Sequence, residues 1–140
     1  MTGRFFLDTN IFVYSLDRSD RRKAVVADGL IGKALSSQKG IISFQVVQEF
    51  FNAAFKRFAA QMEAADGRCY LDEVFSPLLA VHASATLCGE ALNLYAAGNL
   101  SWYDALIVAA ALHVSCDVLY SEDLQHGRKF GNLRIVNPFL

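Results

Sequence analysis

The sequence has few cysteines, almost no net charge and no long apolar run. Its three cysteines (Cys69, Cys88 and Cys116) are odd in number and form no close pair, so a disulfide framework or a cysteine-rich zinc site is not expected. They favour a reducing cytoplasm, where we expect them to act as small buried apolar residues. The longest apolar run, Ala105–Leu112, is too short to span a bilayer, and the N-terminus lacks a signal-peptide pattern, so no membrane partner is expected.

A net charge of −1 excludes the broad basic surface of a protein that binds nucleic acid by charge alone. A local basic rim around an acidic site remains compatible with that charge. Hydrophobic residues make up 54% of the 140 residues and charged residues only 19%, which predicts a sizeable core. Without repeats, low-complexity tracts or linkers, the sequence predicts a single domain over residues 1–140.

Short apolar runs alternate with longer segments of helical spacing along the chain. The predicted strands are Phe5–Leu7, Ile41–Ser43, Leu78–His82, Asp117–Tyr120 and Leu133–Val136. The predicted helices are a short one resuming near Ile11, then Asp20–Ser37, Gln45–Phe58, Gln61–Pro77 (with Gly67 as a possible break), Ser84–Ala97 and Ser101–Leu112. This alternation predicts an α/β fold of three layers, with a central parallel sheet of about five strands covered by helices on both faces.

Acidic residues recur where predicted strands end or predicted helices begin. Asp8 directly follows the first strand, and Glu49 lies early in the Gln45–Phe58 helix, on a polar stripe of an otherwise apolar segment. Asp104 follows Ser101 in a capping-box arrangement, and Asp123 closely follows the fourth strand. Alternatives stay open at this point: Thr9 or Asn10 could cap a helix with Asp8 in support, Asp104 could be only a cap partner, and Glu49 could be solvated.

Ligands of open α/β sheets collect at the carboxyl ends of the strands, where these acids are expected. Four converging carboxylates would repel one another unless a cation neutralised them. Oxygen ligands without His or Cys partners suit Mg²⁺ or Mn²⁺ and disfavour zinc. Because such an ion can activate water and stabilise a leaving oxygen, the pattern points to hydrolysis of phosphodiester bonds.

Four segments together resemble the PIN domain, and most closely the single-domain toxin ribonucleases of VapBC toxin–antitoxin pairs. They are Asp8-Thr9-Asn10, Gln48-Glu49-Phe50, Tyr103–Ala111 and Tyr120-Ser121-Glu122-Asp123. The resemblance covers essentially the whole chain. It implies a PIN-like, Rossmann-like fold and an endoribonuclease that depends on Mg²⁺ or Mn²⁺, is usually a homodimer and is held inactive by a cognate antitoxin protein.

The resemblance also assigns roles to single residues. Asp8 and Asp104 resemble the central metal ligands, Glu49 a ligand or water-orienting acid, and Asp123 the fourth acid. The same motifs make Thr9, Asn10 and Ser121 supporting residues, with Asn10 positioning the first Asp or the water and Ser121 bonding the site. The adjacent Glu122 competes with Asp123 for the inward position, and the hydroxyl residue two places earlier favours Asp123.

A basic segment after the fourth acid offers candidate substrate contacts. His126, Arg128 and Lys129 could touch an RNA phosphate, and a solvated loop is the alternative. Two other functions compete with the nuclease: a catalytically silent PIN-like module that binds RNA or protein, and an aspartyl-phosphate phosphatase. The phosphatase is disfavoured because that chemistry needs an acid two residues after the nucleophile, and position 10 is Asn.

Overall fold

One sheet of six strands runs through the molecule, and the computed structural model describes all of residues 1–140. The strands are β1 (Phe5–Leu7), β2 (Gly40–Ser43), β3 (Leu79–Val81), β4 (Val118–Tyr120), β5 (Lys129–Phe130) and β6 (Leu133–Val136), in the spatial order β3-β2-β1-β4-β6-β5. All neighbours pair in parallel except β5, which runs antiparallel to β6. The predicted α/β fold is confirmed, and the five predicted strands form its parallel part. The edge strand β5 was not predicted.

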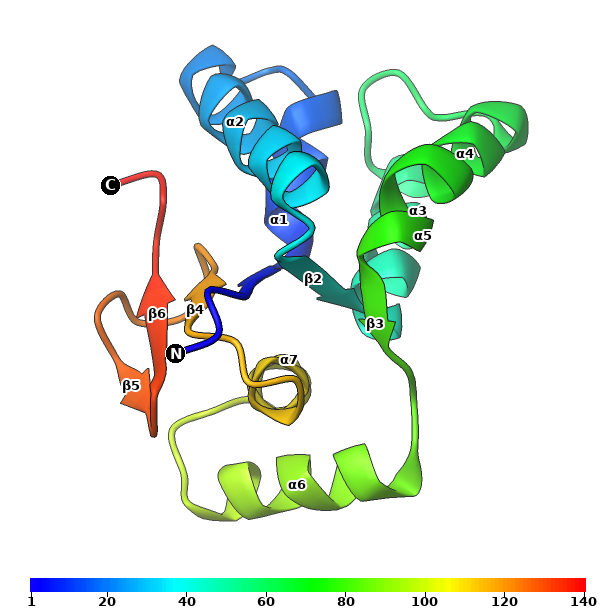
Figure 1. The fold of residues 1–140 in the computed structure, drawn as a ribbon. Coiled ribbons are helices and arrows are strands. Elements are labelled where there is room, and N and C mark those ends of the chain that lie inside the picture. The colour runs from blue at the N-terminus through cyan, green and yellow to red at the C-terminus, as the bar shows by residue number, and fades with distance from the viewer.

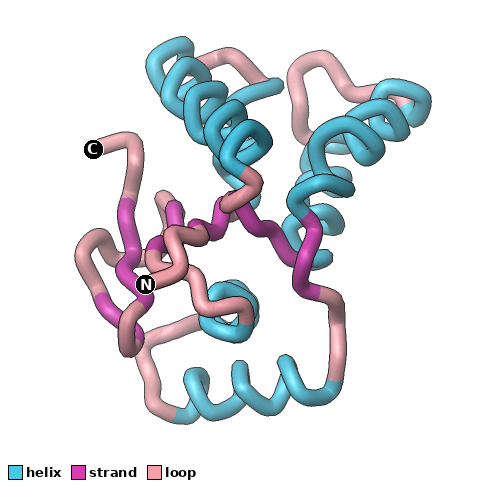
Figure 2. The backbone as a smooth tube through the Cα atoms, viewed as in Figure 1, coloured by secondary structure: helices cyan, strands magenta, loops and turns pink.

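Helices cover both faces of this sheet. They are α1 (Thr9–Leu16), α2 (Arg21–Ser37), α3 (Phe44–Lys56), α4 (Ala64–Tyr70), α5 (Ser76–Leu78), α6 (Ala85–Ala96) and α7 (Trp102–His113). Figure 1 shows α1 to α5 on one side of the strands and α6 and α7 on the other. The tube in Figure 2 shows the strands enclosed between these two groups of helices. Burial on both faces explains why the central strands β1 and β4 are continuously apolar rather than alternating.

Side-chain caps fix where three of the helices begin. Asp20, Ser84 and Ser101 each accept a hydrogen bond from the backbone N–H three residues later, at 3.1, 3.0 and 3.2 Å respectively. These bonds satisfy donors that the first helical turn leaves free. The first helix is also present, and neither Thr9 nor Asn10, the caps that the sequence left as an alternative, occupies its N-cap position. Asp8 itself occupies the N-cap position of α1.

The helical segment predicted over Gln61–Pro77 is irregular, but not at Gly67. That glycine lies inside α4, where an added Cβ would come within 3.1 Å of the Phe51 ring. The irregularity follows at η1 (Leu71–Phe75), a turn of π-helix that brings the fully buried Phe75 into the core before α5 begins. Close packing of helix against ring explains this glycine better than a break in the helix.

The helix α2 lies directly against the start of β2. A Cβ on Gly40 would lie 2.2 Å from the Cβ of Ala34, far inside van der Waals contact. Small residues at both positions therefore let the helix and the sheet meet at this point.

The core is one cluster of 32 buried residues on both faces of the sheet. Of the three cysteines, only Cys116 is buried as predicted; Cys88 is half-buried and Cys69 is exposed, and none is paired. No helix is long and apolar enough to cross a membrane.

The strand order reverses between β1 and β4, since the chain passes from β1 toward β2 on one side and reaches β4 on the other. Such a reversal opens a crevice at the carboxyl ends of the two strands. The residues that follow β1 and β4 therefore face each other at this edge of the sheet.

Candidate active site

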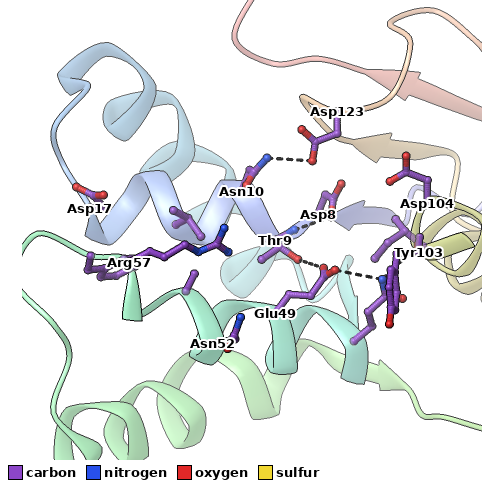
Figure 3. A pocket seen from close by; sticks show the side chains of 15 residues that line it. Asp8, Thr9, Asn10, Asp17, Glu49, Asn52, Arg57, Tyr103, Asp104 and Asp123 are labelled. Carbon is purple, nitrogen blue, oxygen red and sulfur yellow. Dashed lines mark hydrogen bonds between the residues drawn. The ribbon is translucent and has the colours of Figure 1, made fainter. Parts of the chain in front are cut away.

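A pocket of about 600 Å³ lies at this edge of the sheet, and Figure 3 shows the side chains that line it. It is formed by the ends of β1 and β4 with the helices α1, α3 and α7. All four acids singled out in the sequence line it: Asp8, Glu49, Asp104 and Asp123. We call it the acidic pocket.

Asp8 is the most buried of these acids, with 6% of its surface exposed. Its Oδ1 accepts a hydrogen bond of 2.7 Å from the Thr9 backbone N–H, and its Oδ2 accepts one of 2.7 Å from the Ser121 hydroxyl. Burial raises the pKa of Asp8 to about 6; both hydrogen bonds oppose the rise, and the charges of Asp123 and Glu49 add to it. The ionised carboxylate therefore costs free energy in this buried position, and a bound cation would lower that cost.

Glu49 reaches the pocket from α3. Its Oε1 accepts a hydrogen bond of 2.6 Å from the Thr9 hydroxyl, and its Oε2 accepts a longer one of 3.4 Å from Gln45 Nε2. Asn52, one turn further along the same helix, also lines the pocket. The polar stripe predicted on this helix thus faces a polar site at Gln45, Glu49 and Asn52.

Asp104 lies in the first turn of α7 and lines the pocket from a different helix than Glu49. The cap of this helix is the Ser101 hydroxyl, which accepts from the backbone N–H of Asp104 and not from its side chain. The structure gives no return bond from the Asp104 carboxylate to the Ser101 backbone. Capping therefore does not account for an acid at this position.

Asp123 follows β4 and is bound from two sides. Its Oδ2 accepts a hydrogen bond of 3.1 Å from Asn10 Nδ2, and its backbone N–H donates to the Ser121 hydroxyl at 3.2 Å. Burial raises the pKa of Asp123, with further contributions from the charges of Asp104, Glu122 and Glu49. Asn10 thus contacts the fourth acid, whereas the resemblance had suggested the first acid or the water.

Glu122 points away from the acidic pocket. Its Oε1 pairs with Lys23 Nζ of α2 at 2.6 Å, and neither residue lines the pocket. Of the two adjacent acids it is Asp123 that lines the pocket.

The donor set fits a hard divalent cation. Every candidate ligand is a carboxylate or amide oxygen, with no His or Cys among the lining residues. No three acid, His or Cys side chains come close enough together to enclose an ion by themselves. Mg²⁺ commonly keeps several waters and uses only one or two carboxylates, so this spacing is compatible with it.

Sequence reasoning missed several residues of the pocket. Arg57 caps the end of α3, is the one cationic side chain among the lining residues, and has no carboxylate within ion-pair distance. Figure 3 shows its guanidinium extending into the pocket. Asp17 and Tyr103 also line it. Tyr103 precedes a predicted acid, but nothing in the sequence marks Arg57 or Asp17.

The three basic candidates are not brought to the pocket. The His126 Nδ1 accepts from the Asn137 backbone N–H at 3.0 Å, and the guanidinium of Arg128 stacks 4.5 Å above the Phe130 ring. Lys129 begins the edge strand β5. These contacts hold the β5 turn together, so the cation positioned to meet an anion in the pocket is Arg57.

Comparison with known proteins supports the fold described above. No curated protein matches the sequence at a significant level. Among solved structures, the chain is similar to VapC20 of Mycobacterium tuberculosis, a sarcin-ricin loop cleaving toxin, at 21% identity and a TM-score of 0.61, covering 85% of this chain and 89% of that one. It is also similar to a chain of a toxin–antitoxin complex from Klebsiella pneumoniae (18% identity, TM-score 0.64, 95% and 96% covered).

A third similar structure is VapBC2 of Rickettsia felis bound to a DNA fragment from its promoter, at 19% identity and a TM-score of 0.64, with 94% of this chain and 96% of that chain covered. At these identities the likeness establishes the fold. A model of the PIN domain matches residues 5–129, which is most of the chain. The chain therefore belongs to the PIN domain family.

Proposed function

We propose that the protein is an endoribonuclease that depends on Mg²⁺ or Mn²⁺ and serves as the toxin of a type II toxin–antitoxin pair. The observation that carries the proposal is the meeting of four acids from distant parts of the chain in one pocket at the reversal of the strand order. Membership of the PIN family and the toxin–antitoxin neighbours support it.

Each residue has a role in this proposal. Asp8 and Asp104 hold the cation, which when bound would lower the pKa of a coordinated water and stabilise the leaving oxygen. Glu49, fixed by Thr9, and Asp123, fixed by Asn10, orient the attacking water and accept its proton.

Arg57 supplies the positive charge that an RNA phosphate needs in a pocket lined by acids. Its guanidinium is free of ion pairs and can bind two phosphate oxygens at once. It takes the role that the sequence had suggested for His126, Arg128 and Lys129.

The partners are proposed on the same basis. The solved toxin–antitoxin complexes among the structural neighbours support a cognate antitoxin as the inhibitor. A homodimer remains our prediction for the free protein, and sedimentation at several concentrations tests it. The unpaired cysteines are compatible with the cytoplasm as its location.

An RNA cleavage assay with and without EDTA tests the function. Cleavage should require Mg²⁺ or Mn²⁺ and should disappear in Asp104→Asn, while Asp66→Asn, an exposed acid on α4, should cleave as the wild type does. A catalytically silent module would leave RNA intact under every condition. Cleavage that survives EDTA and the Asp104 substitution would reject the proposed site.

A further inference from the structure

A second pocket, of about 310 Å³, adjoins the acidic one. It lies between the start of α3, the connection from β3 to α6 and the start of α7. Three aromatic side chains line it, Phe44, Trp102 and Tyr103, and five of its ten other lining residues are apolar. We call it the aromatic pocket.

The two pockets share a wall. Gln45 and Tyr103 line both of them. Gln45 Nε2 bridges the wall, donating to the Tyr103 carbonyl oxygen at 3.2 Å and to Glu49 Oε2 at 3.4 Å. A ligand held in the acidic pocket therefore needs to pass only this Gln45–Tyr103 wall to enter the aromatic one.

The lining of the aromatic pocket selects against a charged occupant. It contains no Lys, Arg, Asp or Glu, so it offers a phosphate no permanent positive charge. The aromatic surfaces are accessible, since Tyr103 is 64% exposed and Phe44 is 41% exposed. An uncharged, flat group that can stack on these rings fits such a pocket.

Polar groups at the same pocket could read the edge of a flat ligand. Gln48 and His82 lie exposed on its rim, and neither makes a side-chain hydrogen bond within the protein. Ser43 is 3% exposed, lies at the lining, and its Oγ has no hydrogen-bond partner. An apolar pocket with a few unsatisfied polar groups is typical of a specific ligand site.

We propose that the aromatic pocket binds the base of a nucleotide next to the cleaved phosphate of single-stranded RNA. The inference rests on the proposed nuclease function and adds a place where the substrate's sequence is read. The phosphate and the base divide between the two pockets according to charge: the acidic pocket with Arg57 takes the phosphate, and the aromatic pocket takes the base. Unstacked bases of single strands are commonly bound on aromatic rings in this way.

The sole tryptophan of the chain gives a direct readout, because Trp102 lines the aromatic pocket. The experiment uses the full-length Asp8→Asn variant, in which cleavage should be absent and the aromatic pocket unaltered. A short single-stranded oligoribonucleotide is compared with an abasic ribose-phosphate oligomer of equal length. We expect the base-bearing strand to quench Trp102 fluorescence and to bind about tenfold more tightly than the abasic strand.

Two phenylalanines on α3 form a matched pair for this test. Phe44 is 41% exposed and lines the aromatic pocket, whereas Phe55 is 42% exposed and lines neither pocket. Phe44→Ala should remove most of the difference in affinity between the base-bearing and the abasic strand, without changing the affinity for the abasic strand. Phe55→Ala should leave the difference intact.

Equal binding of both strands, with unchanged Trp102 fluorescence, would overturn the inference. Fluorescence that changes with protein concentration alone and ignores RNA would also overturn it, and would assign the pocket to a contact between two copies of the chain. A wild-type protein that cleaves RNA while the strands bind equally would reject the base site and keep the nuclease. The reverse pattern, base-dependent quenching without cleavage by the wild type, would reject the nuclease alone.

Discussion

Neutralising Asp8 should stabilise the metal-free protein and destabilise the metal-loaded one relative to the wild type. Asp8→Asn keeps the shape of the side chain and removes its charge. Because burial raises the pKa of this carboxyl, its ionised form opposes folding near neutral pH. The same carboxylate is proposed to hold the cation, so its loss should matter in the opposite direction once metal is present.

The structure gives the size of the metal-free effect. A rise of the pKa of Asp8 from 3.8 to about 6 corresponds to about 3 kcal/mol of unfolding free energy. Asn has one acceptor oxygen where the carboxylate has two, so the Thr9 N–H or the Ser121 hydroxyl loses its acceptor, which offsets about 1–2 kcal/mol. The net gain of about 1–2 kcal/mol should raise the Tm by roughly 5 °C.

The stability advantage of Asp8→Asn over the wild type should grow as the pH rises. The Asp8 carboxyl binds its proton more tightly in the folded state, so its contribution to stability falls as the pH rises from about 4 through about 6. The advantage of Asp8→Asn should therefore be absent near pH 4 and complete above pH 7. Thermal unfolding in EDTA across this range measures it.

Bound metal should make the wild type more stable than Asp8→Asn, the reverse of the order in EDTA. A cation that binds only the folded state stabilises it by about 2.7 kcal/mol at a concentration of 100 times its Kd, or roughly 8 °C in Tm for a chain of this size. Titration with MnCl₂ should raise the wild-type Tm by that amount and the Asp8→Asn Tm by far less. The exposed-acid control, Asp66→Asn, should follow the wild type throughout.

Two results would refute this reasoning. Equal MnCl₂ responses in wild type and Asp8→Asn would remove Asp8 from the metal site. A variant less stable than the wild type in EDTA at pH 7 would mean that the buried charge does not oppose folding.

Four further changes test the rest of the structure. Asp104→Asn should abolish cleavage but change the free energy of unfolding by no more than about 0.5–1 kcal/mol, because the Ser101 hydroxyl accepts from the backbone N–H of residue 104 and not from its side chain. A circular dichroism spectrum of an unfolded variant would contradict this. Ser121→Ala should raise the pKa of Asp8 further and shift the acid limb of the pH–rate profile to higher pH, and Ser121→Thr should return the limb to its wild-type position. Arg57→Gln should raise KM for RNA and weaken the salt dependence of binding by about one phosphate contact, while Arg57→Lys keeps that slope. Gly40→Ala should cost about 3 kcal/mol in urea unfolding, or prevent folding, because its Cβ would collide with Ala34; a neutral result would show that α2 can move away from the sheet.

Much of the fold follows from hydrophobic spacing and turn chemistry. The β1 run Phe5–Leu7 is apolar and ends at a polar residue, so its location is readable from local sequence alone. The edge strand β5 is different. It has only two residues, one of them Lys129, and its strand character comes from pairing with β6, which no local pattern encodes.

For the candidate site, the acids could be predicted from the sequence but the contacts between their side chains could not. Asp8 and Asp123 could be singled out because they follow strands, and Glu49 and Asp104 because they lie early in predicted helices and in the motifs of the resemblance. The contacts between side chains depend on packing between distant elements, so the bond from Asn10 to Asp123 was not foreseen. Arg57 follows the last residue of α3, where helical periodicity no longer gives a direction for the side chain.

The pocket draws its acids from nearly the full length of the chain. Asp8 follows β1 and Asp123 follows β4, which pairs with β1 on one side and with β6 on the other. No residue of β6 lines the acidic pocket, but β6 holds β4 in place beside β1. A substitution that weakens the β4–β6 pairing should therefore displace Asp123 from the other acids, although it lies outside the pocket itself.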